Sequence, residues 1–228
     1  MTTGGLRCTT NPMKMPPEMV LFDCDGVLVD SEALTADVLC ANLRRHGLAL
    51  THAELGAMFL GGTIMGVEAK ALELGADLPR DWVDQIYAEI FETLGTSVPI
   101  IPGVHAVLDA LDAAGILYAV GSNGPHRKMQ ITLTKTGLMD RLAGRIYSRE
   151  DVAQPKPAPD VYLKAAADAG VAPERCVVIE DSPNGARAGQ AAGMWCLGFA
   201  AETDAALLAP VCDDVFYAMG DLPGLLGL

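Results

Sequence analysis

Residues 19–32 read MVLFDCDGVLVDSE, an apolar run followed at once by two acidic residues and a glycine. Four consecutive apolar residues at 19–22 are typical of a strand that is covered on both faces of a parallel sheet. Because residues i and i+2 of an extended chain point the same way, we expect Asp23 and Asp25 to converge at the end of this strand. Two carboxylates at a buried strand end are costly unless a cation compensates them, so the stretch predicts a metal site.

Five more short apolar runs follow along the chain, separated by longer segments with helical patterns. This alternation predicts an α/β fold with a doubly wound, Rossmann-like parallel sheet. The run at 176–179 is apolar throughout, as expected for a parallel strand that helices cover on both faces. The other four runs lie at residues 116–121, 145–148, 195–199 and 215–217.

The segment between the first and second runs, residues 31–97, is helical by pattern and holds no convincing strand. Val83, Tyr87, Ile90 and Leu94, for example, are spaced so that they share one face of a helix. We therefore predict an α-helical cap domain over residues 31–97, inserted into the sheet domain. The predicted core consists of residues 18–30 and 98–228, and a loosely ordered tail covers residues 1–17.

The composition is that of a globular chain with an acidic balance. The 228 residues are 50% hydrophobic and 20% charged, and the formal net charge is −13. The 16 lysines and arginines are scattered, so we expect no nucleic-acid partner. Six cysteines without a metal-type or disulfide-type spacing favour reduced thiols and a cytoplasmic location. We expect no signal peptide, no membrane association and a monomer, with a homodimer as the alternative.

Polar residues follow further predicted strands, at the edge where open α/β sheets bind ligands. Ser122 and Asn123 come after the second run, and their hydroxyl, amide and neighbouring backbone N–H groups suit an anion. Lys156 stands between two prolines that restrict its backbone, which makes it a candidate phosphate clamp. Glu180 and Asp181 follow the run at 176–179. Their hard oxygen atoms suit Mg²⁺, which binds proteins through one or two carboxylates together with substrate phosphate.

Taken in order, these residues resemble the sequence motifs of the haloacid dehalogenase-like hydrolases. LFDCDGVLVDSE at residues 21–32 looks like the first motif of this family, and Ser122, Lys156 and residues 180–182 look like the second, third and fourth. The resemblance extends over about residues 18–228 and includes the order of core and cap. It is closest to the subgroup with a small helical cap that includes β-phosphoglucomutase and sugar phosphatases. Four motifs in a fixed order are highly specific, whereas Asp-x-Asp-Gly alone is more often a turn.

The resemblance implies a magnesium-dependent phosphatase that hydrolyses a small phosphate monoester through an aspartyl-phosphate. Asp23 would attack phosphorus, and Asp25 would protonate the leaving oxygen and then take a proton from the attacking water. Mg²⁺ would be bound by Asp23, the backbone carbonyl of Asp25 and Asp181, with Glu180 acting through a water molecule.

The resemblance also implies how a small phosphorylated metabolite is held. Ser122, the Asn123 backbone and Lys156 would hold the transferring phosphoryl oxygens. Gly61 and Gly62 in a cap loop would face the leaving group and allow close backbone approach. The stretch at 122–130 is similar to that of family members that act on 6-phosphogluconate. A sugar or sugar-acid phosphate is therefore the leading substrate class, and phosphoglycolate is the alternative.

The sequence leaves other functions open. A sugar phosphomutase of the same subgroup is expected to carry a histidine where Thr35 stands and a Lys or Arg in the loop at 60–66, which holds neither. A dehalogenase has no leaving alkoxide to protonate and so no evident need for Asp25. A non-catalytic binding module on the same fold is expected to lack Asp23 or Asp25, and both are present.

Overall fold

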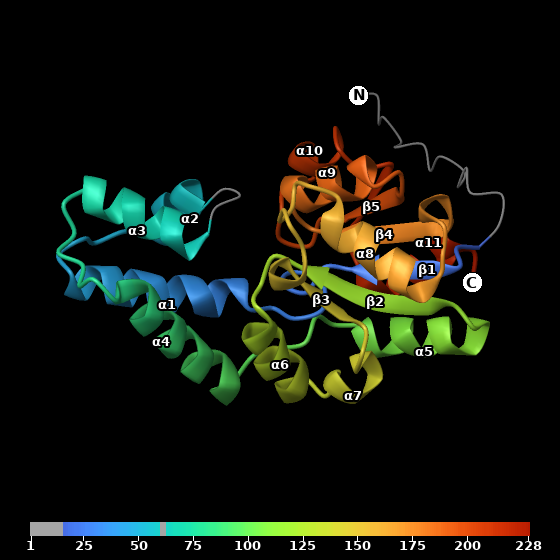
Figure 1. Ribbon diagram of the computed structural model, residues 1–228, viewed down its shortest axis with the longest axis horizontal. Coiled ribbons are helices and arrows are strands. Elements are labelled where there is room, and N and C mark those ends of the chain that lie inside the picture. The colour runs from blue at the N-terminus through green and yellow to red at the C-terminus, as the bar shows by residue number, and fades with distance from the viewer. Residues whose placement is uncertain (1–15, 60–62) are drawn as a thin grey trace, which may run out of the picture.

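The computed structural model describes residues 16–59 and 63–228 (Figure 1). Within them a six-stranded sheet runs in the order β3-β2-β1-β4-β5-β6, and every pairing of neighbouring strands is parallel. The predicted α/β fold with a doubly wound parallel sheet is therefore confirmed. The strands are β1 (Met19–Phe22), β2 (Leu117–Ser122), β3 (Ile146–Ser148), β4 (Cys176–Glu180), β5 (Trp195–Phe199) and β6 (Asp214–Phe216).

Strand β1 lies in the middle of the sheet, where the strand order reverses. The chain places β2 and β3 on one side of it and β4, β5 and β6 on the other. All four residues of β1 and all five of β4 are buried, which explains their uninterrupted apolar sequence. In such sheets the carboxyl ends of the strands at the reversal form the ligand crevice. The relevant ends here are those of β1 and β4.

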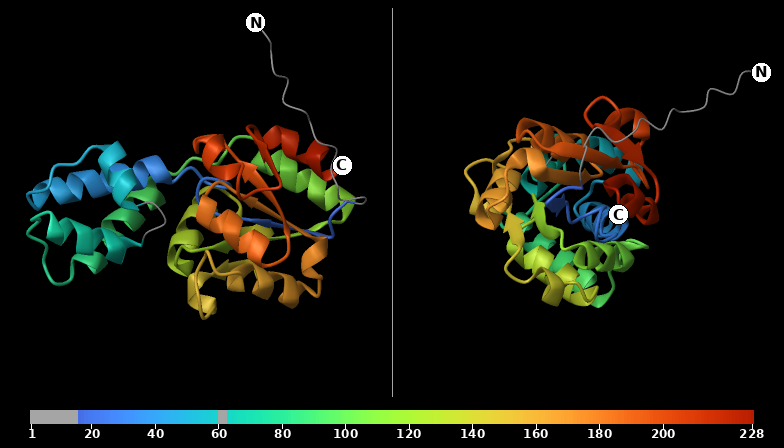
Figure 2. Two further views of the ribbon diagram at one scale, coloured as in Figure 1. Left: turned by 90° about the horizontal axis from the view of Figure 1, so that it is seen from above. Right: turned by 90° about the vertical axis from the view of Figure 1, so that its right-hand side faces the viewer.

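Helices cover both faces of the sheet (Figures 1 and 2). One face packs with Val20 and Phe22 of β1 against helices that include α5 and α6, and the other packs with Met19 and Leu21 against α8 and α9. Alternate residues of one strand thus enter opposite layers. The helices after residue 97 are α5 (Val104–Ala114), α6 (His126–Lys135), α7 (Met139–Leu142), α8 (Asp160–Ala169), α9 (Pro183–Ala191), α10 (Ala205–Leu208) and α11 (Leu222–Leu226), with 3-10 turns at Arg149–Asp151, Pro173–Arg175 and Met219–Asp221.

The first four of the five described helices between β1 and β2 extend away from the sheet (Figures 1 and 2). The buried stripe of the last of them contains Trp82, Ile86, Ile90 and Leu94, whereas Val83 and Tyr87 are only half-buried. The predicted apolar face of this helix was therefore partly wrong: the buried face begins at Trp82 and includes Ile86, in place of Val83 and Tyr87. The four helices are α1 (Glu32–Arg45), α2 (His52–Phe59), α3 (Ile64–Glu73) and α4 (Trp82–Thr96).

A polar contact ties the first and last of these helices together. The Trp82 ring N–H donates to Asn42 Oδ1 at 2.7 Å, and the Asn42 amide donates to Glu89 Oε1 at 3.0 Å. Because Asn42 and Trp82 are buried, pairing their polar groups avoids the cost of leaving them unsatisfied.

The chain enters and leaves the four helices through two segments that run side by side. The Asp30 N–H donates to the Pro99 carbonyl at 2.9 Å, and the Ile101 N–H donates to the Leu28 carbonyl at 3.0 Å. Helix α4 also packs on α6 of the sheet layer, where the Arg127 guanidinium lies 5.2 Å from the centre of the Phe91 ring. The division into a core of 18–30 and 98–228 and a cap of 31–97 stays a prediction. The tail predicted over 1–17 falls almost wholly outside the described residues.

No helix among residues 16–59 and 63–228 is both long and apolar enough to cross a membrane. The cysteines in those ranges are free thiols, and four of them are buried in the hydrophobic layers.

Candidate active site

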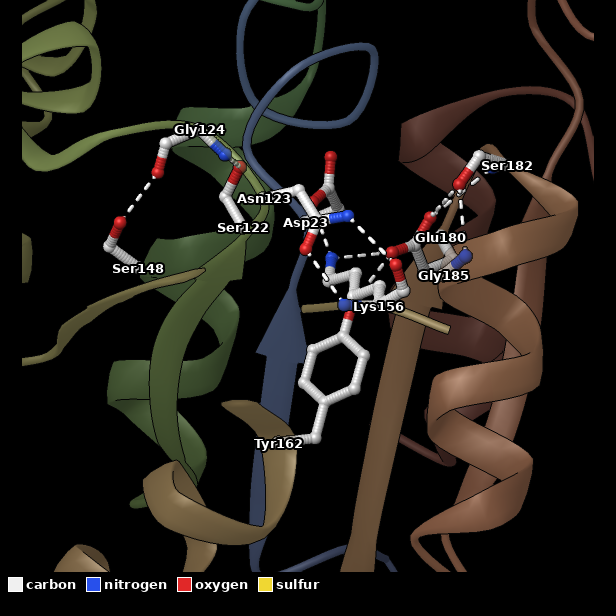
Figure 3. Close-up of polar contacts among 10 residues, drawn as sticks. All are labelled: Asp23, Ser122, Asn123, Gly124, Ser148, Lys156, Tyr162, Glu180, Ser182 and Gly185. Carbon is white, nitrogen blue, oxygen red and sulfur yellow. Dashed lines mark hydrogen bonds and ion pairs between the residues drawn. The ribbon is translucent and has the colours of Figure 1, made fainter. Parts of the chain in front are cut away.

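Residues that are far apart in sequence meet at the carboxyl edge of the sheet (Figure 3). Asp23 directly follows β1, Ser122 is the last residue of β2, and Glu180 is the last residue of β4, with Asp181 next to it. Adjacent parallel strands bring these four positions together because their carboxyl ends point the same way. The structure thus gathers the candidate residues at one edge, as the sequence predicts.

Lys156 is the charged centre of this group. Its ammonium lies 2.6 Å from Asp23 Oδ1 and 2.6 Å from Glu180 Oε1, and only 3% of its side chain is exposed. Burial opposes the charge on Lys156, but the two carboxylates outweigh it and raise the lysine pKa. The Asn123 side chain holds the lysine backbone, since its Oδ1 accepts from the Lys156 N–H at 2.9 Å and its amide donates to the Lys156 carbonyl at 3.1 Å.

Glu180 is completely buried and fully hydrogen-bonded. Besides Lys156, the Tyr162 hydroxyl donates to its Oε1 at 2.8 Å, and the Ser182 N–H and hydroxyl donate to its Oε2 at 3.2 and 3.0 Å. Helix α9 passes directly over this carboxylate. A Cβ on Gly185 would lie 1.6 Å from Glu180 Oε1, so only glycine fits there.

Asp25 lies on the more open side of the group. The Lys128 ammonium, in the first turn of α6, lies 2.8 Å from Asp25 Oδ1, and the Ser31 hydroxyl donates to the same oxygen. Burial opposes the ionisation of Asp25, but the charge and hydrogen bond of Lys128 and the hydrogen bond of Ser31 together lower its pKa below the usual value. Asp25 is therefore held as a carboxylate.

Asp23 and Asp181 experience the opposite effect. Burial raises the pKa of Asp23 to about 7 against the partial compensation of Lys156, and neighbouring Glu180 and Asp25 raise it further. Burial likewise raises the pKa of Asp181 well above its usual value, with Glu180 and Asp23 adding to the effect. These carboxyls are short of positive charge, because one lysine faces three acidic groups.

The acidic groups form a set that fits a divalent cation. Asp23, Glu180 and Asp181 each offer a carboxylate oxygen, and the three oxygens lie within 4.8 Å of one another. Gly26, with a φ of +78°, permits this approach, since a Cβ there would lie 1.9 Å from Asp181 Oδ2. Hard oxygen ligands and a local excess of negative charge suit Mg²⁺. Because both oxygens of Glu180 already accept hydrogen bonds, Asp23 and Asp181 are the better placed of the three.

The loop after β2 forms the other wall of the group. Ser122 Oγ accepts a hydrogen bond from the Gly124 N–H at 2.9 Å, and the Ser148 hydroxyl donates to the Gly124 carbonyl at 2.7 Å. These bonds fix the turn that carries Ser122 and Asn123 beside Asp23 (Figure 3). Gly61 and Gly62, the predicted leaving-group contacts, lie outside the described residues.

Two contacts of the site, those of Tyr162 and Lys128, were not predicted from the sequence. Tyr162 had no signal beyond being an aromatic residue with a hydroxyl, which needs a partner when it is buried. Lys128 had a weak signal, because it stands in the first turn of the helix that follows Ser122. Neither partner was predictable, since Tyr162 and Lys128 reach carboxylates on other elements, Glu180 of β4 and Asp25 after β1.

Comparison with known proteins identifies the family. The chain is 32% identical over 187 residues to 6-phosphogluconate phosphatase of Escherichia coli strain K12, which covers 81% of this chain and 83% of that protein. A conserved haloacid dehalogenase-like protein from Agrobacterium tumefaciens strain C58 matches with a TM-score of 0.80 and 32% identity, over 92% of this chain and 97% of that one. A HAD family hydrolase from Deinococcus radiodurans R1, solved with bound phosphate and sodium, matches with a TM-score of 0.76 and 36% identity over the same shares. The family model of haloacid dehalogenase-like hydrolases matches residues 17–193, and the chain therefore belongs to this family of enzymes.

Proposed function

We propose that this enzyme is a magnesium-dependent phosphatase that hydrolyses a small phosphate monoester through an aspartyl-phosphate on Asp23. One observation carries the proposal: the Lys156 ammonium bridges Asp23 and Glu180, 2.6 Å from each, beside Asp181 at the reversal point of the sheet. A carboxylate nucleophile, a fixed cation and a candidate metal site are what phosphoryl transfer needs, because positioning and charge stabilisation supply most of the catalysis. The phosphatase name of the Escherichia coli relative supports this reading.

In the first half of the reaction, an Asp23 carboxylate oxygen forms a bond to phosphorus while the bond between phosphorus and the ester oxygen breaks. Asp25 protonates the leaving alkoxide with a proton that it takes from the Lys128 ammonium, whose nitrogen lies 2.8 Å from Asp25 Oδ1. An alkoxide is far more basic than either group, so this pair is a sufficient acid. The products of this step are the free alcohol and a phosphorylated Asp23.

In the second half, water attacks the phosphorus of phosphorylated Asp23. Asp25 accepts a proton from this water and returns it to Lys128, and the lowered pKa of Asp25 favours the carboxylate form that this role requires. The bond between phosphorus and Asp23 breaks, which releases inorganic phosphate and returns the Asp23 carboxylate.

The remaining residues hold and neutralise the phosphoryl group. Lys156 would contact the phosphoryl oxygens from one side, and Ser122 and the Asn123 backbone from the other. Asp23, Asp181 and the Asp25 carbonyl would hold Mg²⁺, with Glu180 contributing through a water molecule. The ion would supply positive charge that keeps Asp23 ionised and offsets charge on the transferring group.

We propose a sugar or sugar-acid phosphate as the substrate class. The name of the Escherichia coli relative supports 6-phosphogluconate as the first candidate, and phosphoglycolate is the alternative within the same chemistry. A phosphomutase remains the rival reaction. Thr35, which stands where a mutase histidine is expected, donates its hydroxyl to the Ser31 carbonyl of its own helix at 2.8 Å and so serves the backbone.

The test is phosphate release by metal-stripped protein with and without Mg²⁺, across 6-phosphogluconate, glucose 6-phosphate, a hexitol phosphate, phosphoglycolate and β-glucose 1-phosphate. We expect release that requires Mg²⁺ and is fastest for one sugar or sugar-acid phosphate. Conversion of β-glucose 1-phosphate to glucose 6-phosphate without release of phosphate would replace the phosphatase with the mutase. Equal rates in Mg²⁺ and in chelator would contradict the metal requirement.

A further inference from the structure

Tyr162 lies beneath the active site and contacts two of its charged groups (Figure 3). It belongs to α8 and is fully buried. Its hydroxyl donates to Glu180 Oε1 at 2.8 Å, and its ring centre lies 4.6 Å from the Lys156 ammonium. A cation over the face of an aromatic ring is attracted to it, especially where water is excluded. Tyr162 therefore contacts both Glu180 and Lys156.

The hydrogen bonds that Glu180 accepts hold its carboxylate in a single orientation. Oε1 accepts from Lys156 at 2.6 Å and from Tyr162 at 2.8 Å, while Oε2 accepts from both the N–H and the hydroxyl of Ser182. Loss of the Tyr162 hydroxyl would leave Oε1 held by Lys156 alone. Because Lys156 also holds Asp23, any rotation of Glu180 would be transmitted to the Asp23 carboxylate.

Strand β2 has a glycine where it passes the Tyr162 ring. A Cβ on Gly121 of β2 would lie 3.0 Å from the Tyr162 ring, tighter than most Cβ contacts, so glycine at this position makes room for the ring. The residue that follows Gly121 is Ser122 of the active site. The ring is thus packed against the strand that carries Ser122 while its hydroxyl fixes Glu180 on another strand.

We propose that Tyr162 is a positioning residue for the phosphoryl transfer. Its hydroxyl orients Glu180, and Glu180 together with the Tyr162 ring holds the Lys156 ammonium on Asp23. Tyr162 does not itself touch the substrate. The proposal rests on the proposed phosphatase function for its catalytic readout, so a second readout that needs no turnover accompanies it.

The first experiment compares Tyr162→Phe with Tyr118→Phe. Tyr118 is a second buried tyrosine, near the opposite end of β2 from Ser122, and its loss controls for removing a buried hydroxyl. With p-nitrophenyl phosphate and Mg²⁺, we expect Tyr162→Phe to lower kcat about tenfold with KM changed less than about twofold, as for losing a hydrogen bond to a charged group. Tyr118→Phe should keep kcat within about twofold. Equal kcat values for the two variants would overturn the proposal.

A double-mutant cycle tests whether Tyr162 acts through Glu180. In a Glu180→Gln background, Tyr162→Phe should lower kcat by less than about twofold, since the carboxylate that it orients is already gone. A further tenfold loss in that background would show that Tyr162 acts by another route and would overturn the proposal.

The readout without turnover is the affinity for beryllium trifluoride, a phosphoryl mimic, measured calorimetrically with Mg²⁺. We expect Tyr162→Phe to weaken it about tenfold and Tyr118→Phe to leave it unchanged, even if the wild-type protein hydrolyses no monoester in the panel. In that case the phosphatase proposal fails while the positioning role stands. Unchanged affinity in Tyr162→Phe alongside an active wild-type enzyme would overturn the positioning role alone, and a wild-type protein that neither binds the mimic nor releases phosphate would overturn both.

Discussion

The active site has two regions that each contain a lysine–aspartate ion pair, and the two pairs differ in burial and in the number of carboxylates that the lysine contacts. In the floor, formed by Asp23, Lys156, Tyr162 and Glu180, the lysine side chain is 3% exposed and bridges two carboxylates. In the rim, formed by Asp25, Ser31 and Lys128, the lysine side chain is 16% exposed and pairs with one carboxylate.

The difference shows in the two aspartates. Asp23 and Asp25 are two residues apart, yet burial raises the pKa of Asp23 to about 7, whereas Lys128 and Ser31 outweigh burial and lower the pKa of Asp25. Environments that separate the pKa values of two carboxyls assign them different chemical roles. The floor is short of positive charge and suits a metal, and the rim already has the charge that keeps Asp25 ready to accept a proton.

The largest expected effect comes from the floor nucleophile. Asp23→Asn should lower kcat at least about 10⁴-fold while the protein still folds, because the amide keeps the volume but cannot form the phosphorylated intermediate. Steady-state phosphate release measures this, with Asp221→Asn, an exposed aspartate near the C-terminus, as the control. Activity of Asp23→Asn within tenfold of the wild-type enzyme would rule out the proposed mechanism.

The next largest effect is on the free energy of unfolding, and it is expected to differ between a lysine replacement in the floor and the same replacement in the rim. In metal-free protein, Lys156→Met should lower the free energy of unfolding by about 3–5 kcal/mol, because it leaves two buried carboxylates without a cation. Lys128→Met should lower it by only about 1 kcal/mol, since that pair is closer to solvent. Urea unfolding at neutral pH measures both values. If the two variants were equally stable, the contrast between floor and rim would be wrong.

The raised pKa of Asp23 predicts a pH dependence of the metal-free protein. Because the folded pKa of about 7 exceeds the ordinary 3.8, the folded chain binds this proton more tightly than the unfolded chain. The stability that protonated Asp23 contributes to the folded chain is complete below about pH 4 and is lost as the pH rises to about 7. We expect Tm to fall by roughly 5 °C or more across this range and Asp23→Asn to reduce the fall.

Magnesium sharpens this prediction. The ion takes the place of the proton on the floor carboxyls, so Mg²⁺ should raise Tm more at pH 8 than at pH 5. A rise in Tm that is the same at both pH values, or that persists in Asp23→Asn, would place the ion elsewhere.

The smallest effect concerns the packing of the floor. Gly185→Ala should lower the free energy of unfolding by about 1–3 kcal/mol, because its Cβ would collide with the buried Glu180 carboxylate. Gly224→Ala, in α11, is the matched control, since a Cβ there meets no atom within 4 Å. Equal stability of the two variants would mean that Glu180 moves freely, contrary to its hydrogen bonding.

Much of the fold was predictable from local patterns. Each of the six strands lies within one residue of its predicted bounds, because strands of a parallel sheet covered by helices are rich in apolar residues. The buried face of α4 was predicted less well, since helical spacing allows neighbouring stripes and the packing of Trp82 selected one of them.

The sequence by itself determined the order of strands and helices along the chain and the strand-end residues that gather at the carboxyl edge: Asp23, Ser122, Glu180 and Asp181. Both follow from local signals, because apolar runs define strands and parallel strands present their ends together. Only the tertiary structure decided that Lys156 bridges Asp23 and Glu180, that Tyr162 lies beneath them, and that Lys128 pairs with Asp25. These contacts set the opposite pKa shifts of Asp23 and Asp25, and they depend on burial and on distances between chain segments that no local pattern encodes.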